Sequence, residues 1–248
     1  MILSVHDVAR TIDASALKIE TNYADLCALV EACKQYDFGC AFIWQDFSRE
    51  MRDMLKGTNT EFGTSLAFPS GQEPTFIKEK QAEWFMTMDP IEVDMVMNVG
   101  WLRSKKFKET ADDILAVRRI IGDVSLKVII EAMQLTDEEI INACKVCLDA
   151  GVDYVKSGSG FSQTPTTLHH VELIKETVGD AAKIKIAGGV RDLKTLLQMY
   201  KRGARRFGIG YRNAVKIMDA AIASGMQEFD TELADELVFE DAAPVAGY

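Results

Sequence analysis

Two lysines, Lys156 and Lys185, each end a short apolar run that is typical of a buried strand. Glycine soon follows both, as Gly158 after the first lysine and as Gly188-Gly189 after the second. Lysine is almost never fully buried without a partner, so both positions need an explanation. Two ammonium groups held close together lower each other's pKa, and a neutral amine can form a Schiff base with a carbonyl. The pair therefore predicts carbonyl chemistry.

Two further charges interrupt apolar runs of the same kind. Asp94 lies between Val93 and Met95, and Lys127 directly precedes Val128-Ile129-Ile130. An imine on a lysine acts as an electron sink, and the proton movements that follow need a general acid or base beside it. Asp94 is the candidate for that role, directly or through a water. Two alternatives stay open: a lysine at a strand end is often a solvent-facing rim residue, and Asp94 could be an ordinary buried partner of Lys127.

Short β-rich runs alternate with amphipathic stretches almost to the end of the chain. The predicted strands are Arg10–Ser15, Gly39–Trp44, Glu61–Phe68, Glu92–Asn98, Ser125–Glu131, Asp153–Ser157, Ala182–Ala187 and Arg205–Ile209. The predicted helices are Tyr23–Tyr36, Lys106–Ile121, Asp137–Ala150, Pro165–Val178 and Asp192–Arg202. Strict alternation implies parallel strands joined by crossover helices. Eight such strands favour a closed (β/α)8 TIM barrel of the α/β class over an open doubly wound sheet.

In such a barrel the active-site groups come from the C-terminal ends of the strands. We therefore expect Asp94, Lys127, Lys156 and Lys185 to point into one cavity or to stack below it. No shift in composition and no Pro/Ser-rich linker divides the chain, so we expect a single barrel domain over residues 1–248. Its last residues, 242–248, are predicted to form a flexible tail.

Composition and charge exclude several functional classes. Hydrophobic residues make up 48% of the 248 residues and charged residues 27%, which is ordinary globular usage. The net charge of −10 argues against nucleic acid and anionic membrane surfaces as partners. No apolar run approaches the roughly 20 residues that span a bilayer. Because the start at Met1 also lacks the basic and long apolar regions of a signal peptide, we expect a cytoplasmic protein.

Cysteine and histidine give no sign of a disulfide framework or a metal site. The chain has five cysteines, an odd number, and Cys144 and Cys147 form a C-x-x-C inside a predicted helix, where we expect plain packing. The three histidines, His6, His169 and His170, lack metal-ligand spacing among themselves. We expect no structural zinc and no cofactor.

Four segments together carry a family resemblance: residues 92–100, 126–139, 150–161 and 185–191. They resemble the deoxyribose-phosphate aldolases of the DeoC type, and the similarity runs through most of the barrel. The resemblance implies a class I lyase of carbohydrate degradation that reversibly cleaves 2-deoxy-D-ribose 5-phosphate to acetaldehyde and D-glyceraldehyde 3-phosphate. It implies Lys156 as the imine lysine, Lys185 as the lysine that lowers its pKa, and Asp94 as the proton-relay carboxylate. Lys127 would then support Asp94.

The same resemblance implies that backbone N–H groups after the seventh and eighth strands bind the substrate's phosphate. Glycine lets the backbone approach an anion, as Gly188-Gly189 would. The family's usual eighth-strand pattern of glycine, a small residue and two serines is replaced here by Gly208-Ile209-Gly210-Tyr211-Arg212. Two hydroxyl donors are missing, and Arg212 is either a substitute contact or a surface residue. The predicted substrate-binding residues are Ser157, Ser159, Gly160, Gly188, Gly189, Gly208, Gly210 and Arg212.

Three other places bear on the comparison with this family. Trp44-Gln45 stands where an Asn-Pro-like pair is usual, and Ala14-Ser15 follows Asp13 where His-Thr is common. Trp44 would narrow the cavity or make it more apolar. Some members end in a tyrosine on a mobile tail that assists proton transfer, and Tyr248 is the candidate here, against the alternative of a tail without a role.

Three competing functions remain open. The altered eighth strand motivates an aldolase of the same fold with a different donor or an unphosphorylated acceptor. A barrel isomerase for a sugar phosphate would rest on carboxylates and need no imine. A non-catalytic binding protein is disfavoured because an unused buried charge cluster is costly. The expected partners are small aldehydes and sugar phosphates, and the resemblance allows a homodimer.

Overall fold

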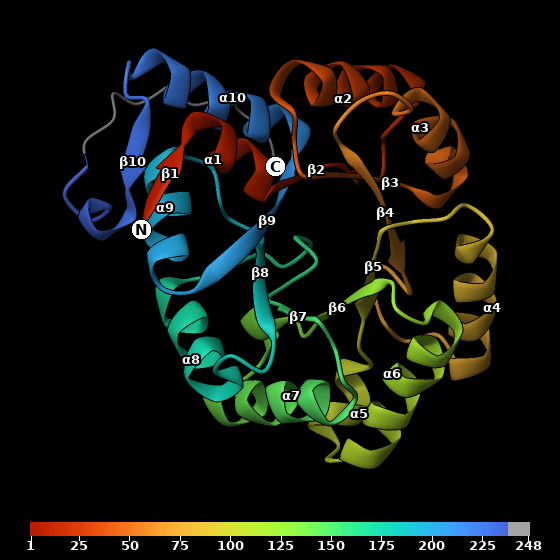
Figure 1. Cartoon of the computed structure of the whole chain (residues 1–248). Coiled ribbons are helices and arrows are strands. Elements are labelled where there is room, and N and C mark those ends of the chain that lie inside the picture. The colour runs from red at the N-terminus through yellow and green to blue at the C-terminus, as the bar shows by residue number, and fades with distance from the viewer. Residues whose placement is uncertain (238–248) are drawn as a thin grey trace.

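The computed structural model describes residues 1–237, and eight parallel strands in them close into a barrel in chain order. Figure 1 shows these strands surrounded by a ring of helices. The barrel strands are β2 (Ile12–Ala16), β3 (Cys40–Ile43), β4 (Glu61–Leu66), β5 (Glu92–Val96), β6 (Ser125–Ile129), β7 (Tyr154–Lys156), β8 (Lys183–Ala187) and β9 (Ala204–Gly210). The predicted α/β TIM barrel is confirmed. No helix within residues 1–237 is long and apolar enough to cross a membrane.

The helices surround the barrel (Figure 1). They are α1 (Val5–Thr11), α2 (Tyr23–Tyr36), α3 (Ser48–Met54), α4 (Thr75–Met86), α5 (Val99–Arg103), α6 (Phe107–Ile121), α7 (Asp137–Asp149), α8 (Leu168–Val178), α9 (Leu193–Lys201) and α10 (Tyr211–Ala223), with short 3-10 turns η1 (Gln45–Phe47), η2 (Ala132–Gln134) and η3 (Thr231–Leu233). The five predicted helices correspond to α2, α6, α7, α8 and α9. The other five helices were not among the predicted stretches, and α4 carries Lys78 on its buried face, which weakens its apolar pattern.

Several local signals behave as the sequence predicts. The Thr136 hydroxyl accepts a hydrogen bond from the Glu139 N–H, which starts α7 with a capping box. Gly151 and Gly203 follow helix ends with positive φ, a conformation that glycine adopts without strain. Cys144 and Cys147 are buried on α7, and burial raises the pKa of Cys144 to about 12, so this C-x-x-C is packing.

The N-terminal end of the chain differs from the predicted pattern. The expected strand Arg10–Ser15 begins only at Ile12, because a capping box between Ser4 and Asp7 starts the helix α1, which includes Arg10. Outside the barrel, β1 (Ile2–Ser4) pairs antiparallel with β10 (Glu228–Asp230), so the two ends of the described chain lie side by side (Figure 1).

Candidate active site

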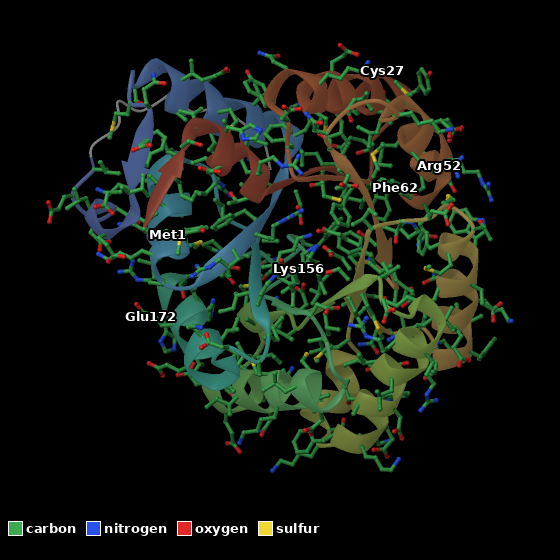
Figure 2. All side chains as sticks on the ribbon, viewed as in Figure 1. Met1, Cys27, Arg52, Phe62, Lys156 and Glu172 are labelled. Atoms are coloured by element: carbon green, nitrogen blue, oxygen red, sulfur yellow. The ribbon has the colours of Figure 1, made fainter. Side chains whose placement is uncertain are left out.

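The structure brings Lys156, Lys185 and Asp94 together inside the barrel. The Oδ2 atom of Asp94 accepts hydrogen bonds from Lys156 Nζ at 2.7 Å and from Lys185 Nζ at 2.6 Å. The three residues are 4%, 1% and 0% exposed, in the order Lys156, Lys185, Asp94. Lys156 on β7 is the register partner of Lys185 on β8, and Figure 2 shows Lys156 near the middle of the helix ring. Three groups predicted from separate parts of the sequence therefore share one carboxylate oxygen.

The two lysines differ in their proton affinity. Burial lowers the pKa of Lys156, and the Lys185 ammonium lowers it further, although the nearby Asp94 carboxylate acts in the opposite direction. Burial also acts to lower the pKa of Lys185, but the carboxylates of Asp13 and Asp94 outweigh burial and raise it. Lys156 is therefore the amine that loses its proton first, and Lys185 stays charged beside it.

The carboxyl group between them stays ionised. Burial alone would raise the pKa of Asp94, but the ammonium groups of Lys156 and Lys185 outweigh burial and lower it. Asp94 is thus a carboxylate with one oxygen committed to two lysines, and its Oδ1 atom has no hydrogen-bond partner within residues 1–237. That free oxygen is available to accept a proton.

A second charged cluster, here called the lower network, lies toward the N-terminal ends of the strands: Asp13, Glu92, Lys127 and Arg206. Arg206 Nε donates to Asp13 Oδ1 at 2.8 Å, and the Arg206 guanidinium lies 3.1 Å from Glu92 Oε1. Asp13 joins this network to the site through its Oδ2 atom, 2.5 Å from Lys185 Nζ. Sequence reasoning missed Asp13, Glu92 and Arg206 as site residues. A charge at every second position of a buried strand, as in Glu92 and Asp94, was the available signal.

The predicted role of Lys127 needs correction. Its Nζ pairs with Glu92 and lies 4.0 Å from Asp13, whereas the two other lysines take Asp94 Oδ2. The physical reason is position: Glu92 precedes Asp94 by two residues on the same inward face of β5 and offers an oxygen free of those lysines. Lys127 still lowers the pKa of Asp94 through its charge, so its support is electrostatic and indirect.

The charges of the whole cluster balance in one protonation state. Three carboxylates and four basic groups are connected by ion pairs: Asp13, Glu92, Asp94, Lys127, Lys156, Lys185 and Arg206. Buried charge is costly unless it is compensated. The numbers of positive and negative charges are equal when Lys156 is neutral, which agrees with the direction of its pKa.

Two predicted substrate-binding serines are instead engaged within the protein. The Ser157 hydroxyl donates to the Ala187 carbonyl at 3.1 Å and accepts from the Ala187 N–H at 3.1 Å, while the Ser157 N–H donates to the Lys185 carbonyl. Ser157 therefore braces the end of β7 against β8, which corrects the expected substrate contact. The Ser159 N–H donates to Glu131, and its hydroxyl oxygen accepts from the Phe161 N–H at 3.1 Å.

The predicted glycines lie at the C-terminal ends of β7, β8 and β9. Gly160 and Gly188 both have positive φ, and a Cβ atom added to Gly188 would lie 3.6 Å from the Cα atom of Gly160. Gly189 also has a positive φ of 98°. A Cβ atom on Gly208 would lie 3.5 Å from Cε of Lys185 and 3.8 Å from Cε of Lys156, so glycine leaves room beside the two amines.

The last predicted contacts lie where β9 enters α10. Gly210 is the N-cap of α10, and no side chain caps this helix end. Arg212 is 62% exposed in its side chain and donates to Asp25 of α2 at 2.7 Å, so it forms a surface ion pair. Tyr248, the predicted proton-transfer residue of the tail, lies outside the described residues 1–237.

Apolar side chains cover the charged cluster on the C-terminal side of the barrel. Val96 and Ile129 follow Asp94 and Lys127 by two residues, and Ile129 is the register partner of Lys156. They pack with Leu17, Trp44 and Phe68.

Three rings, Trp44, Phe68 and Phe161, meet edge to face with centroids 5.5 to 6.3 Å apart, and we call them the aromatic mouth. The mouth makes this end of the site apolar, as expected for Trp44.

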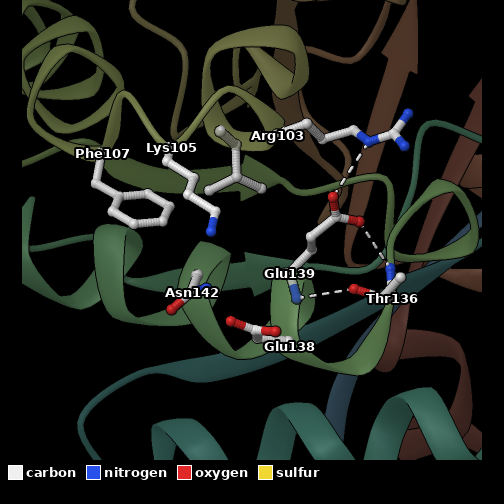
Figure 3. A pocket seen from close by; sticks show the side chains of 8 residues that line it. Arg103, Lys105, Phe107, Thr136, Glu138, Glu139 and Asn142 are labelled. Carbon is white, nitrogen blue, oxygen red and sulfur yellow. Dashed lines mark hydrogen bonds and ion pairs between the residues drawn. The ribbon is translucent and has the colours of Figure 1, made fainter.

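A separate surface pocket of about 130 Å³ lies outside the barrel between the start of α6 and the start of α7 (Figure 3). Some of its polar groups already have partners: Glu139 pairs with Arg103 at 3.3 Å and accepts from the Thr136 N–H at 2.9 Å. The pocket contains none of the predicted site residues, so it gives no support to a second active site.

A family model described as DeoC/LacD family aldolase matches residues 6–217. The chain belongs to the DeoC/LacD family of aldolases. As a member it is an aldolase, a carbon–carbon lyase, which confirms the resemblance found in the sequence and counts against the isomerase and the non-catalytic binding protein.

Individual relatives agree with this family. The chain is 36% identical to the deoxyribose-phosphate aldolase of Histophilus somni (strain 2336) over 82% of this chain and 91% of the relative. It is 34% identical to the deoxyribose-phosphate aldolase of Carboxydothermus hydrogenoformans, over 90% and 98% respectively. Among solved structures, the aldolase QR15 superposes with a TM-score of 0.82 and 27% identity, covering 88% of this chain and 98% of that one.

A more distant structure supports the fold alone. The tetrameric deoxyribose phosphate aldolase from Aeropyrum pernix is 21% identical and superposes with a TM-score of 0.81, covering 90% of this chain and 94% of that one. Its barrel therefore matches closely despite the low identity.

Proposed function

We propose that the chain is a class I aldolase that reversibly cleaves 2-deoxy-D-ribose 5-phosphate to acetaldehyde and D-glyceraldehyde 3-phosphate. The observation that carries the proposal is the shared Asp94 Oδ2 atom, which holds two buried lysines of unlike pKa against one carboxylate. A neutral amine beside an ammonium group, with a carboxylate to move protons, is suited to imine chemistry. The relatives named deoxyribose-phosphate aldolase support the substrate.

The reaction begins with the neutral Lys156 amine. It attacks the aldehyde carbon of the open-chain sugar, and loss of water from the carbinolamine gives a protonated imine. A base then removes the proton of the C3 hydroxyl, the C2–C3 bond breaks, and its electron pair moves toward the imine to form an enamine. D-Glyceraldehyde 3-phosphate leaves at this step. Protonation of the enamine at C2 and hydrolysis release acetaldehyde and restore the amine.

Asp94 and Lys185 fill the two supporting roles. Asp94 is the base and acid, because its Oδ1 atom is free while Oδ2 is held by both lysines. Lys185 remains protonated and lowers the pKa of Lys156 by its charge. Asp13 holds Lys185 in the charged state from the other side, at 2.5 Å.

The phosphate is assigned to the backbone around Gly188-Gly189 and the start of α10. The N-terminus of a helix attracts anions through its free N–H groups and its dipole. The 13-residue helix α10 begins after Gly210 with no side chain capping it. The glycines of the β8 loop add backbone that an anion can approach closely.

The aromatic mouth favours a second candidate, an aldolase of the same mechanism with an unphosphorylated acceptor. Trp44, Phe68 and Phe161 present apolar edges near the site, and Arg212 is occupied by Asp25. Comparing kcat/KM for 2-deoxyribose 5-phosphate with that for 2-deoxyribose separates the two candidates. A clear preference for the phosphorylated sugar supports the first, and equal values support the second.

The imine itself is tested by trapping. The protein is incubated with acetaldehyde, reduced with borohydride, and the adduct mapped by peptide mass spectrometry. We expect one reduced adduct on Lys156, none in Lys156→Met, and the wild-type adduct in Lys183→Met, which removes an exposed lysine on β8. A protein that acquires no adduct, or acquires it on another lysine, would contradict the proposal.

We propose a cytoplasmic enzyme that acts as a homodimer, with the chain as one barrel domain; the tail predicted over residues 242–248 lies outside the described residues 1–237. Light scattering of the full chain tests the assembly, and a mass of four subunits would favour a tetramer like that of the Aeropyrum pernix protein instead.

A further inference from the structure

Two buried oxygen atoms on the neighbouring strands β4 and β5 have no hydrogen-bond partner within residues 1–237. They are Oγ of Ser65 and Oδ1 of Asp94. Ser65 is 5% exposed and Asp94 is fully buried. Buried polar atoms in folded proteins nearly always have a partner, so two such atoms at a catalytic site indicate a bound group.

The two atoms belong to adjacent positions of the inner wall. Ser65 on β4 is the register partner of Asp94 on β5. Side chains two residues apart on a strand share a face, so Ser65 and Gly63 face the same way. Gly63 lies against the Phe42 ring, and that ring lies 4.1 Å from Lys185 Nζ, so this face of β4 is the inner one. The serine hydroxyl and the free carboxylate oxygen therefore line the same part of the barrel interior.

The hydrogen-bonding properties of Ser65 Oγ and Asp94 Oδ1 indicate which molecule can bind between them. Asp94 Oδ1 is an ionised acceptor, so its partner must donate a hydrogen bond. A serine hydroxyl can donate to that same partner or accept from it. A water molecule satisfies both, and a proton relay through one water is within the reach of a general base.

We propose that Ser65 is a positioning residue for proton transfer: its hydroxyl and Asp94 Oδ1 hold the water that carries the proton between Asp94 and the α-carbon of the imine. This inference rests on the proposed function. When the α-carbon loses its proton, the proton passes to the water oxygen while the water gives one of its own protons to Asp94 Oδ1. The C–H electron pair becomes the enamine double bond, and the C=N pair moves to nitrogen, which neutralises the iminium charge.

The neighbouring residue provides a matched control. Thr64 Oγ1 is also buried without a partner in the described part of the chain, but Thr64 points to the opposite face of β4. Ser65→Ala and Thr64→Val each remove one such hydroxyl from the same strand. Only the first removes it from the barrel interior.

The experiment measures two steps separately with acetaldehyde alone, which has no hydroxyl of its own to fill the position. Borohydride trapping on Lys156 reports imine formation, and exchange of the methyl protons for deuterium in D₂O, followed by NMR, reports proton transfer. We expect Ser65→Ala to trap acetaldehyde as the wild type does but to exchange about tenfold more slowly, the effect of one lost hydrogen bond. Thr64→Val should match the wild type in both.

The outcomes separate this inference from the proposed function. Absence of a trapped adduct in the wild type would overturn both. Normal trapping with unchanged exchange in Ser65→Ala would overturn the role of Ser65 alone. An equal loss of exchange in Thr64→Val would do so too, because it would trace the effect to the stability of β4. Ser65→Thr, which keeps the hydroxyl, should restore faster exchange than Ser65→Ala.

Discussion

The imine end of this site and its proposed phosphate end are built in opposite ways. The imine end consists of side chains, with Asp94, Lys156 and Lys185 each less than 5% exposed and joined through one carboxylate oxygen. The phosphate end consists of backbone, with glycines after β8 and the uncapped start of α10. Its one charged side chain, Arg212, is 62% exposed and paired with Asp25.

The difference follows from what each end must do. An imine lysine needs a particular pKa, which depends on burial and on charges at fixed distances, so every partner must be held in place. Binding an anion at a helix start needs only N–H groups that the backbone supplies whatever the side chains are. We therefore expect the proposed phosphate end to tolerate the loss of two serine hydroxyls, whereas a change at the imine end should alter the chemistry.

The largest effect is expected from Asp94→Asn. The amide cannot accept the proton, so deuterium exchange of acetaldehyde should fall by about 10² to 10⁴-fold, the usual contribution of a general base. Trapping on Lys156 should persist, because Asp94 acts to raise the pKa of Lys156 and its loss leaves the amine neutral. Exchange by NMR and trapping by mass spectrometry measure the two steps.

A buried pair elsewhere separates this chemical effect from a loss of stability. Asp113 is 1% exposed and lies 2.6 Å from Lys78, behind the barrel wall. Asp113→Asn also breaks a buried ion pair, which typically costs about 3 to 5 kcal/mol of the free energy of unfolding. If both variants lose exchange equally at a temperature where both are folded, the chemical role of Asp94 is wrong.

The next effect concerns pH. Trapping needs the neutral Lys156 amine, so the trapping rate rises with pH and levels off once the pH exceeds the pKa of Lys156. Lys185→Met removes a charge that lowers this pKa, so the profile should move to higher pH, with a slower rate at pH 7 that recovers in alkaline buffer. The initial rate of borohydride-trapped adduct formation, measured across pH, tests this.

The control is the third buried lysine of the barrel. Lys127 is fully buried like Lys185 but pairs with Glu92 in the lower network. Lys127→Met should lower the melting temperature as Lys185→Met does, but shift the pH profile less. Equal shifts would mean that total buried charge, and not the neighbouring ammonium, sets the pKa of Lys156.

The sequence predicted the imine end better than its surroundings for a physical reason. The alternation of apolar and polar residues is a local property of the sequence, so all eight barrel strands were predicted. No predicted strand boundary differs from the observed one by more than two residues. A charge inside an apolar run is a local signal too, which is why Asp94, Lys156 and Lys185 were identified. The pairing of charges, in contrast, depends on which strands become neighbours when the barrel closes. Asp13 and Arg206 meet across a separation of 193 residues, which no local pattern contains.

Lys127 and Ser157 have other partners than the sequence predicts, because neighbouring groups compete for the same polar atoms. Lys127 was expected beside Asp94, and the register agrees, but the long side chain reaches Glu92 because Asp94 Oδ2 is already shared by two lysines. Ser157 was expected to contact substrate, but its hydroxyl is used by the Ala187 backbone. The position of a residue in its strand determines where its side chain begins. Competition among neighbouring polar groups then determines which hydrogen-bond or ion-pair partner that side chain takes.

The smallest effect is expected at the phosphate end, from Arg212→Gln. Because Arg212 is exposed, a contact between its guanidinium and the phosphate would contribute no more to binding than an exposed ion pair, about 0.2 to 1 kcal/mol. The KM for 2-deoxyribose 5-phosphate should therefore rise less than about fivefold, with kcat unchanged. Asp25→Asn is the counterpart, because it frees the guanidinium that Asp25 now holds at 2.7 Å. A tenfold or larger rise of KM in Arg212→Gln, with a fall in Asp25→Asn, would show that Arg212 leaves Asp25 to bind phosphate. The phosphate end would then depend on a charged side chain, as the imine end does, and the contrast between them would be one of exposure alone.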